Sequence, residues 1–526
     1  MGVDEFITAI KQYTLEEYFS RFGEIEQALR GLEGKLTNFS PEQKRDILDR
    51  IAGLTVGSPP FCRLHILSFC MKVSGDRKFT ERLLEEVLAA DYDEVGEYNK
   101  LSHFWQIETA IFQNPKLGSF KVEQLLARLY KELFVAFEQS FGLNGRNYIP
   151  IEERDKDLVF VFTGQVLGME HAPTKTLLDR CYVLQRILKK KVLIINTAMQ
   201  TPQKGQAPFY GLVNAEYAKS LADLKELEFR GEYFGYYQCK DNMPDLETMA
   251  ELIRLVKRRK PFYLVDIGGS DICADLCGLF VPQITISTVF SKIAASCGEY
   301  QLVDKELLQE DKEILAILGA QPENVKRTMF TFSFKRQTHY FTRKELGLPQ
   351  DAFIVLVVGW RLDDEVDDVF LEMLEHVVMT KEHIVVAFMG IFDSGKERMT
   401  SFPGLQERVY YLGKQMDALA VIECCDLYVN PKRNGGGSSA AEALYKGLPV
   451  LTLPTGDVAA AAGKAFWTAD YQAMENQIVR YCQDKSYYSE MSQKASKRAE
   501  KLMDSEAAFG KTMRELERGF RKGILC

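Results

Sequence analysis

Long apolar runs and an excess of basic residues are both missing from this sequence. No stretch approaches the roughly 20 consecutive apolar residues that a membrane-spanning helix needs, and the N-terminal residues MGVDEF lack the basic region and apolar core of a secretory signal. The 66 Lys and Arg residues are outnumbered by 74 Asp and Glu residues, for a net charge of -8. Proteins that bind nucleic acid through its phosphates are usually basic. We therefore expect a cytoplasmic protein with no membrane span and no nucleic-acid partner.

Paired cysteines at metal-ligand spacing are missing as well. The 11 Cys residues are scattered along the chain, and none belongs to a Cys-x2-Cys pair. Cys62 and His65 have a Cys-x2-His spacing, but no second pair stands nearby to complete a four-ligand site. This pattern predicts reduced, mostly buried thiols, with neither a disulfide framework nor a structural metal.

The length of 526 residues exceeds what one hydrophobic core organises, and the patterning changes along the chain. Residues 1–150 have apolar side chains at helical spacing, for example Leu15, Tyr18, Phe19 and Phe22, and no strand-like run. This segment predicts an all-α domain. Since no motif in it suggests chemistry, we expect it to dock or recognise an acceptor.

Two α/β segments follow, residues 151–340 and residues 341–526. Continuous apolar runs alternate with helical stretches in both, which predicts buried parallel strands, and the second segment ends in an amphipathic helical tail. The runs are 157–163, 191–197, 261–270 and 283–288 in the first segment and 353–359, 384–390, 409–413, 427–431 and 449–454 in the second. We predict an α/β protein with two Rossmann-like domains.

A glycine-rich turn after the fourth run of the second segment has the strongest functional signal. Glycines let the backbone approach a ligand closely and adopt positive φ, and the N–H groups at a helix start favour phosphate groups. Ser438 and Ser439 are able to cap the following helix and to donate hydroxyls to phosphate. Glu442, one turn further, is placed to accept hydrogen bonds from a ribose. The candidate donor-binding residues of this segment are Asn434, Gly435, Gly436, Gly437, Ser438, Ser439 and Glu442.

The same segment resembles the donor-site motif of GT-B glycosyltransferases. That motif is Asp-x-Tyr/Phe-Val-x-Pro, then a glycine-containing loop, then Glu-Ala-x3-Gly-x-Pro-Val, and residues 426–431 and 442–450 match it. The residues LGLP at 346–349 also resemble the entry into the C-terminal domain of that family. The resemblance implies two Rossmann-like domains facing a cleft, a UDP-sugar donor and no cofactor.

Arg361 matches the basic residue that neutralises the donor diphosphate in this family. Members often add a lysine a few residues later, whereas an acidic run at 363–368 follows here, and Lys432 or Arg433 is the substitute we consider. We interpret the acidic run as a solvated face rather than a metal site.

Two features resemble the inverting protein glycosyltransferases. Retaining members have a Glu eight positions before the residue that matches Glu442, and this chain has Asn434 there. The spacing of Asn434, Ser438 and Glu442 is closer to the bacterial adhesin N-glucosyltransferases and, more distantly, to O-GlcNAc transferase. The adhesin enzymes also have an all-helical domain before the GT-B core. The resemblance implies a protein acceptor, while a glycan or lipid-linked acceptor and either stereochemical outcome stay open.

One residue on the acceptor side is a candidate catalytic group. His171 follows the first predicted strand at the sheet edge where ligands bind, and an imidazole suits a general base or a donor to sugar or phosphate. The alternative is a surface histidine before a helix. Ser270 and Asp271 are weaker candidates on the same rim, and His339 is either in a hinge strand or at the donor edge.

A metal-independent reaction is the expectation, because the Asp-x-Asp triplets at 91–93 and 155–157 lie away from the predicted ligand edge. Two other functions share this architecture. A nucleotide-sugar epimerase eliminates UDP and adds water back, but such enzymes usually lack a long helical segment before the core. The absent Glu and Lys also fit a GT-B fold kept as a chaperone or partner-binding subunit.

Overall fold

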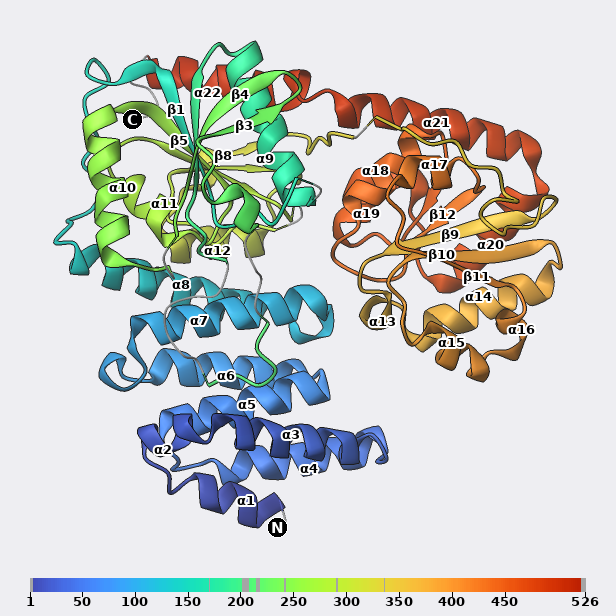
Figure 1. The fold of residues 1–526 in the computed structure, drawn as a ribbon, viewed down its shortest axis with the longest axis horizontal. Helices are drawn as coiled ribbons and strands as arrows, with labels where there is room; N and C mark the ends of the chain where they lie inside the picture. The colour runs from blue at the N-terminus through green and yellow to red at the C-terminus, as the bar shows by residue number, and fades with distance from the viewer. Residues whose placement is uncertain are drawn as a thin grey trace.

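The computed structural model describes residues 3–169, 171–200, 208–213, 218–240, 243–289, 292–334 and 336–521. The chain forms a stack of helices and two α/β domains (Figure 1). In the view of Figure 1 the helical stack lies beneath the first α/β domain, and the second α/β domain stands beside them. None of the helices in the described part of the chain is both long enough and apolar enough to cross a membrane.

The N-terminal segment is all-α, as its apolar spacing predicts. The side chains of Thr14 and Ser40 each accept a hydrogen bond from the backbone N–H three residues on. The side chains of Glu17 and Gln43 accept one from the N–H of Thr14 and Ser40 in turn. These paired bonds fix where two of the helices begin. The helices are α1 (Val3–Ile10), α2 (Leu15–Ser20), α3 (Phe22–Leu36), α4 (Pro41–Leu54), α5 (Pro60–Ser74), α6 (Arg77–Ala89), α7 (Tyr92–Gln113, kinked at Gly96) and α8 (Phe120–Ser140).

The helical stack and the first sheet share one hydrophobic core. Leu158, Phe160 and Phe162 point from the sheet into the same cluster as the buried side chains of the stack. The Tyr130 hydroxyl of α8 donates to Asp275 Oδ2 at 2.7 Å, inside helix α11 (Ile272–Cys277). The stack is therefore a continuation of the first α/β domain rather than a separate module.

The first sheet has eight strands in the order β3-β4-β2-β1-β5-β6-β7-β8, all parallel except β3. They are β1 (Asp155–Thr163), β2 (Lys191–Asn196), β3 (Glu226–Phe229), β4 (Glu232–Gln238), β5 (Pro261–Gly268), β6 (Gln283–Ser287), β7 (Tyr300–Val303) and β8 (Val325–Arg327). The four predicted strands are confirmed as β1, β2, β5 and β6. The other four were missed because they are short or mix polar residues with apolar ones.

The second sheet has five parallel strands in the order β11-β10-β9-β12-β13, which confirms all five predicted runs. The strands are β9 (Phe353–Gly359), β10 (Ile384–Gly390), β11 (Val409–Gly413), β12 (Leu427–Val429) and β13 (Val450–Leu451). The helices around them include α14 (Asp368–Thr380), α18 (Gly437–Tyr445), α19 (Gly456–Ala462), α20 (Tyr471–Gln483) and α21 (Lys485–Met503). The predicted pair of Rossmann-like domains is thus present.

The helical tail divides between the two domains. Helix α21 packs on the second sheet, whereas Phe509, Met513 and Phe520, in and around α22 (Lys511–Arg521), lie in the core of the first. The chain therefore crosses between the domains twice, once after β8 and once after α21, as Figure 1 shows.

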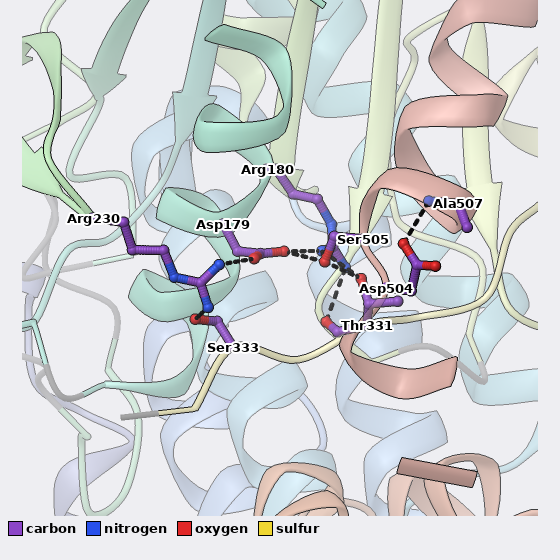
Figure 2. Close-up of polar contacts among 8 residues, drawn as sticks. All are labelled: Asp179, Arg180, Arg230, Thr331, Ser333, Asp504, Ser505 and Ala507. Atoms are coloured by element: carbon purple, nitrogen blue, oxygen red, sulfur yellow. Dashed lines mark hydrogen bonds and ion pairs between the residues drawn. The ribbon is translucent and has the colours of Figure 1, made fainter. Parts of the chain in front are cut away.

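A buried polar network joins these two crossings (Figure 2). Arg180, in helix α9 (Ala172–Tyr182), donates from Nη1 to Asp179 Oδ2 at 2.6 Å and to Thr331 Oγ1 at 2.7 Å. Ser505 Oγ donates to the same Asp179 oxygen at 2.6 Å. Thr331 lies on the first crossing and Ser505 on the second, so α9 holds both segments at one point.

Candidate functional site

A cleft of about 1880 Å³ lies where the carboxyl ends of both sheets face each other, and the helical stack forms part of its wall. The predicted candidates His171, Arg361, Asn434 to Ser439 and Glu442 all line it. Ligand sites of parallel sheets lie at such edges. The structure thus brings these residues together, while their individual roles stay predictions.

The glycine turn is shaped by close contacts that exclude side chains. Gly436 precedes α18 with φ of 99°, and a Cβ there would lie 2.6 Å from Arg433 Nη2. A Cβ on Gly435 would lie 3.5 Å from the Phe112 ring. No side chain caps the start of α18, so its first N–H groups are available where the helix dipole favours an anion. The turn is a suitable site for a diphosphate.

The two serines differ in their surroundings. Ser439 Oγ donates to the Gly436 carbonyl at 2.9 Å and lies 3.0 Å from the Tyr428 hydroxyl, so it holds the turn in shape. Ser438 is half-buried and lines the cleft. Of the two, Ser438 is the better placed to contact a phosphate.

Glu442 faces the opposite domain across the cleft. Burial raises the pKa of its carboxyl, and the positive charge of Lys175 on α9 opposes that rise. The charges of Glu442 and Lys175 therefore act on each other across the cleft, which both residues line. The ribose-binding role assigned to Glu442 stays a prediction.

Three charged side chains hold the floor of the donor side. Glu365 accepts from Arg361 Nη2 at 2.8 Å with one carboxylate oxygen and from Arg433 Nη1 at 2.6 Å with the other. Arg433 is buried and also donates to Asn430 Oδ1 at 2.8 Å and to the Tyr428 hydroxyl at 2.9 Å. Arg433 therefore supports the turn, and Lys432 does not line the cleft.

The interpretation of the acidic run as a solvated face is wrong for one of its members. Glu365 is buried because it binds both arginines, although Asp367 and Asp368 do lie at the surface end of α14. The Arg361 side chain is one-third exposed, at 32%, so it remains able to meet an anion, and its buried Nε has no hydrogen-bond partner among the described residues.

His171 is the residue immediately before α9, and its Nδ1 has no hydrogen-bond partner among the described residues. Burial lowers the pKa of His171, and the charge of Lys175 lowers it further. The imidazole is therefore neutral near pH 7. A neutral ring at a helix start, beside a lysine, is suited to donate a hydrogen bond to a negatively charged ligand.

The weaker acceptor-side candidates differ in whether they line the cleft. Ser270 lines the cleft, in a left-handed conformation with φ of 56°. Asp271 does not line it, because its carboxylate caps α11 by accepting from the Ala274 N–H at 3.0 Å and binds Thr197. His339 lines the cleft from the first interdomain crossing, where its backbone N–H donates to Asp417 Oδ2 at 3.0 Å.

The helical stack contributes residues that the sequence did not suggest. Trp105, Glu108, Thr109 and Phe112 of α7 line the cleft. The guanidinium of Arg361 lies 4.7 Å from the centre of the Phe112 ring. Burial raises the pKa of Glu108 to about 7. Helix α7 therefore forms a wall of the cleft, while the acceptor-recognition role expected of this segment stays a prediction.

No group of three or more His, Cys, Asp or Glu side chains in the described ranges is arranged to hold a metal ion. The described cysteines are thiols rather than disulfides, and all but Cys482 are buried.

Residues 352–484 match the family model of glycosyl transferases group 1. Among solved structures, a mutant of the Thermobaculum terrenum O-GlcNAc transferase matches with a TM-score of 0.51 at 14% identity, over 95% of this chain and 98% of that one. Anabaena HepE in complex with UDP and glucose matches with a TM-score of 0.47 at 12% identity, over 69% and 99%. A glycosyltransferase from Rickettsia africae matches with a TM-score of 0.48 at 11% identity, over 70% and 99%. No curated protein matches this chain in sequence.

Proposed function

We propose that this chain, which has the GT-B fold and a glycosyl transferase group 1 domain, transfers a sugar from a UDP-sugar donor to a protein side chain. The observation that carries the proposal is the uncapped start of α18, which opens onto the cleft beside Arg361. The alternatives left by the sequence, an epimerase and a non-catalytic subunit, become outcomes of the tests below.

The donor diphosphate lies, in this proposal, against the glycine turn. Backbone N–H groups at the start of α18, the Ser438 hydroxyl and the Arg361 guanidinium stabilise the negative charge that grows on the departing UDP. Glu442 holds the ribose. Because positive charge is already supplied by the helix and Arg361, we propose a reaction that needs neither a metal nor another cofactor.

His171 contacts the donor from the opposite domain. Its neutral ring and the neighbouring Lys175 favour a hydrogen bond to the sugar or to a phosphate oxygen, and the ring is also a candidate for the general base. Closure of the cleft around donor and acceptor would exclude water and limit hydrolysis.

The size of the cleft supports a large acceptor. At about 1880 Å³ it exceeds the roughly 300 to 1,000 Å³ typical of small-molecule sites. It continues along the helical stack to Phe19 and Phe22, and to the exposed side chains of Leu212 and Val213. An extended polypeptide fits such a groove. We also propose a cytoplasmic location, where UDP-sugars are available to the enzyme.

The decisive experiment is a panel of UDP-sugars and GDP-sugars, assayed for nucleotide release with and without candidate acceptor proteins. We expect release of UDP, with label transferred to protein. Conversion of UDP-N-acetylglucosamine to an isomer would instead show an epimerase. Absence of UDP binding by calorimetry would show a non-catalytic subunit. Unchanged UDP affinity in Ser438→Ala would remove the phosphate role of that side chain.

A further inference from the structure

Helix α7 reaches the donor turn from the helical stack. Its cleft-facing residues Trp105, Glu108, Thr109 and Phe112 recur at the spacing of one helix face. Phe112 packs against the Arg361 guanidinium, and its Cζ lies 3.5 Å from where a Cβ on Gly435 would stand. The end of this face is therefore in direct contact with the proposed diphosphate site.

Glu108 is one helical turn before Phe112 on the same face. A separation of four residues corresponds to about 6 Å along the helix axis, roughly the width of one sugar ring, so Glu108 lies about that far along α7 from the residue that contacts Arg361. Ser270 Oγ donates to Glu108 Oε2 at 3.3 Å. Ser270 follows β5, and His171 follows the loop after β1. Between these two neighbouring strands the strand order changes direction, because β2 to β4 lie on one side of β1 and β5 to β8 on the other. Glu108 thus lies over the crevice where a parallel sheet binds its ligand.

Most other carboxylates along the cleft are already engaged. Glu365 binds Arg361 and Arg433, and Asp417 accepts backbone N–H groups from the interdomain crossing. Glu123 pairs with Lys292 at 3.4 Å. Glu442, on the opposite domain, has the ribose role in our proposal. By contrast, the hydrogen bond that Glu108 accepts among the described residues is the long one from Ser270 Oγ, at 3.3 Å.

We propose that Glu108 is the general base that accepts the proton of the acceptor hydroxyl. The inference rests on the proposed glycosyl transfer and deepens it. The acceptor oxygen forms a bond to the anomeric carbon while the bond from that carbon to the diphosphate breaks. The electron pair leaves with UDP, the hydroxyl proton moves to the Glu108 carboxylate, and solvent takes that proton after product release.

With Glu108 as the base, His171 takes the other of its two proposed roles, that of a hydrogen-bond donor. The charge of Lys175 disfavours a second positive charge on the imidazole, so His171 is a poor proton acceptor and a suitable hydrogen-bond donor to the departing group. Around Glu108, Lys292 is the charged group that opposes the effect of burial, and Glu123 pairs with that lysine. A carboxyl with a pKa of about 7 is matched to accepting a proton near neutral pH.

The test compares Glu108→Gln with Glu132→Gln in the full chain, using UDP-glucose and UDP-N-acetylglucosamine and a pool of Ser- and Thr-containing peptides. We expect Glu108→Gln to lower kcat by about 100-fold or more, with UDP affinity by calorimetry unchanged. Glu108→Asp should recover part of the loss. Glu132→Gln, which changes an exposed carboxylate of α8 outside the cleft lining, should keep the wild-type rate.

The pH profile separates a base from a structural group. Only the ionised carboxylate accepts a proton, so wild-type kcat/KM should rise with pH through about 7 and then level, whereas Glu108→Gln should lose that rise. A Glu108→Gln enzyme with the wild-type kcat and pH profile overturns the assignment while leaving glycosyl transfer intact. A wild-type protein that neither binds UDP nor releases it overturns the proposed function itself, and the assignment with it.

Discussion

The two walls of the cleft that meet between Arg361 and Phe112 are held by different forces. The donor wall joins two stretches of chain through ion pairs between the buried Glu365 and two arginines, Arg361 and Arg433. The α7 wall is held by apolar packing in a core that runs from the helical stack into the first sheet. It also buries His103, whose pKa burial lowers to about 4. A single site thus combines a wall fixed by ion pairs with a wall held by apolar packing.

The largest effect should come from removing Arg433. Its ion pair with Glu365 leaves the two side chains only 4% and 5% exposed. Arg433→Met would leave the Glu365 carboxylate buried with one partner fewer, so the free energy of unfolding should fall by about 3 kcal/mol or more. Urea unfolding measures this, and the exposed neighbour Lys432→Met is the control. A loss below about 1 kcal/mol would show that the donor wall does not depend on its ion pairs.

Acid should weaken the α7 wall. The pKa of His103 is about 4 in the folded chain, below the roughly 6.5 expected when unfolded, so the unfolded state binds more protons between these values. The stabilisation is complete above about pH 6.5 and is lost as pH falls through about 4, by about 3 kcal/mol in all.

Urea unfolding at a series of pH values follows this loss. His103→Leu should flatten the dependence, whereas His376→Leu, a substitution of an exposed histidine in the second domain, should leave it unchanged. An equally steep dependence in His103→Leu would place the acid sensitivity elsewhere.

Arg361→Ala tests whether the charged wall takes part in the reaction. Losing a positive group aimed at the leaving diphosphate should lower kcat/KM for the UDP-sugar by about 100-fold. Lys396→Ala, an exposed change in the same domain, is the control. If steady-state kinetics show both variants at the wild-type value, Arg361 does not meet the donor.

Phe112→Leu tests the junction of the two walls and should have the smallest effect. It keeps an apolar side chain but removes the ring over the Arg361 guanidinium, a contact worth about 0.5 to 1 kcal/mol. The KM for the donor should rise about threefold to fivefold, with kcat little changed. Phe39→Leu, at an exposed site of the helical stack, serves as the comparison. An unchanged KM would mean that the stack only borders the donor site.

Local pattern predicted much of the second domain. Its strands are continuous apolar runs, three of which end at glycines, and such runs are recognisable within a few residues. The glycine turn and Glu442 were predicted from short spacings along the chain, and Arg361 from the resemblance to GT-B glycosyltransferases. Strands β3 and β4 were missed because their alternating pattern of polar and apolar residues resembles a surface segment, although Gly231 marks the turn between them with φ of 78°.

By itself, the sequence determined the helical N-terminal segment, the parallel sheets and the glycine turn, because helix, strand and turn preferences act over short stretches. Only the tertiary structure decided that Glu365 is buried between two arginines, that the last helix returns to the first domain, and that Glu108 and Phe112 of α7 line the cleft. These contacts join residues far apart in the chain. They depend on how separate apolar faces pack together, which the spacing of residues within one short stretch does not indicate.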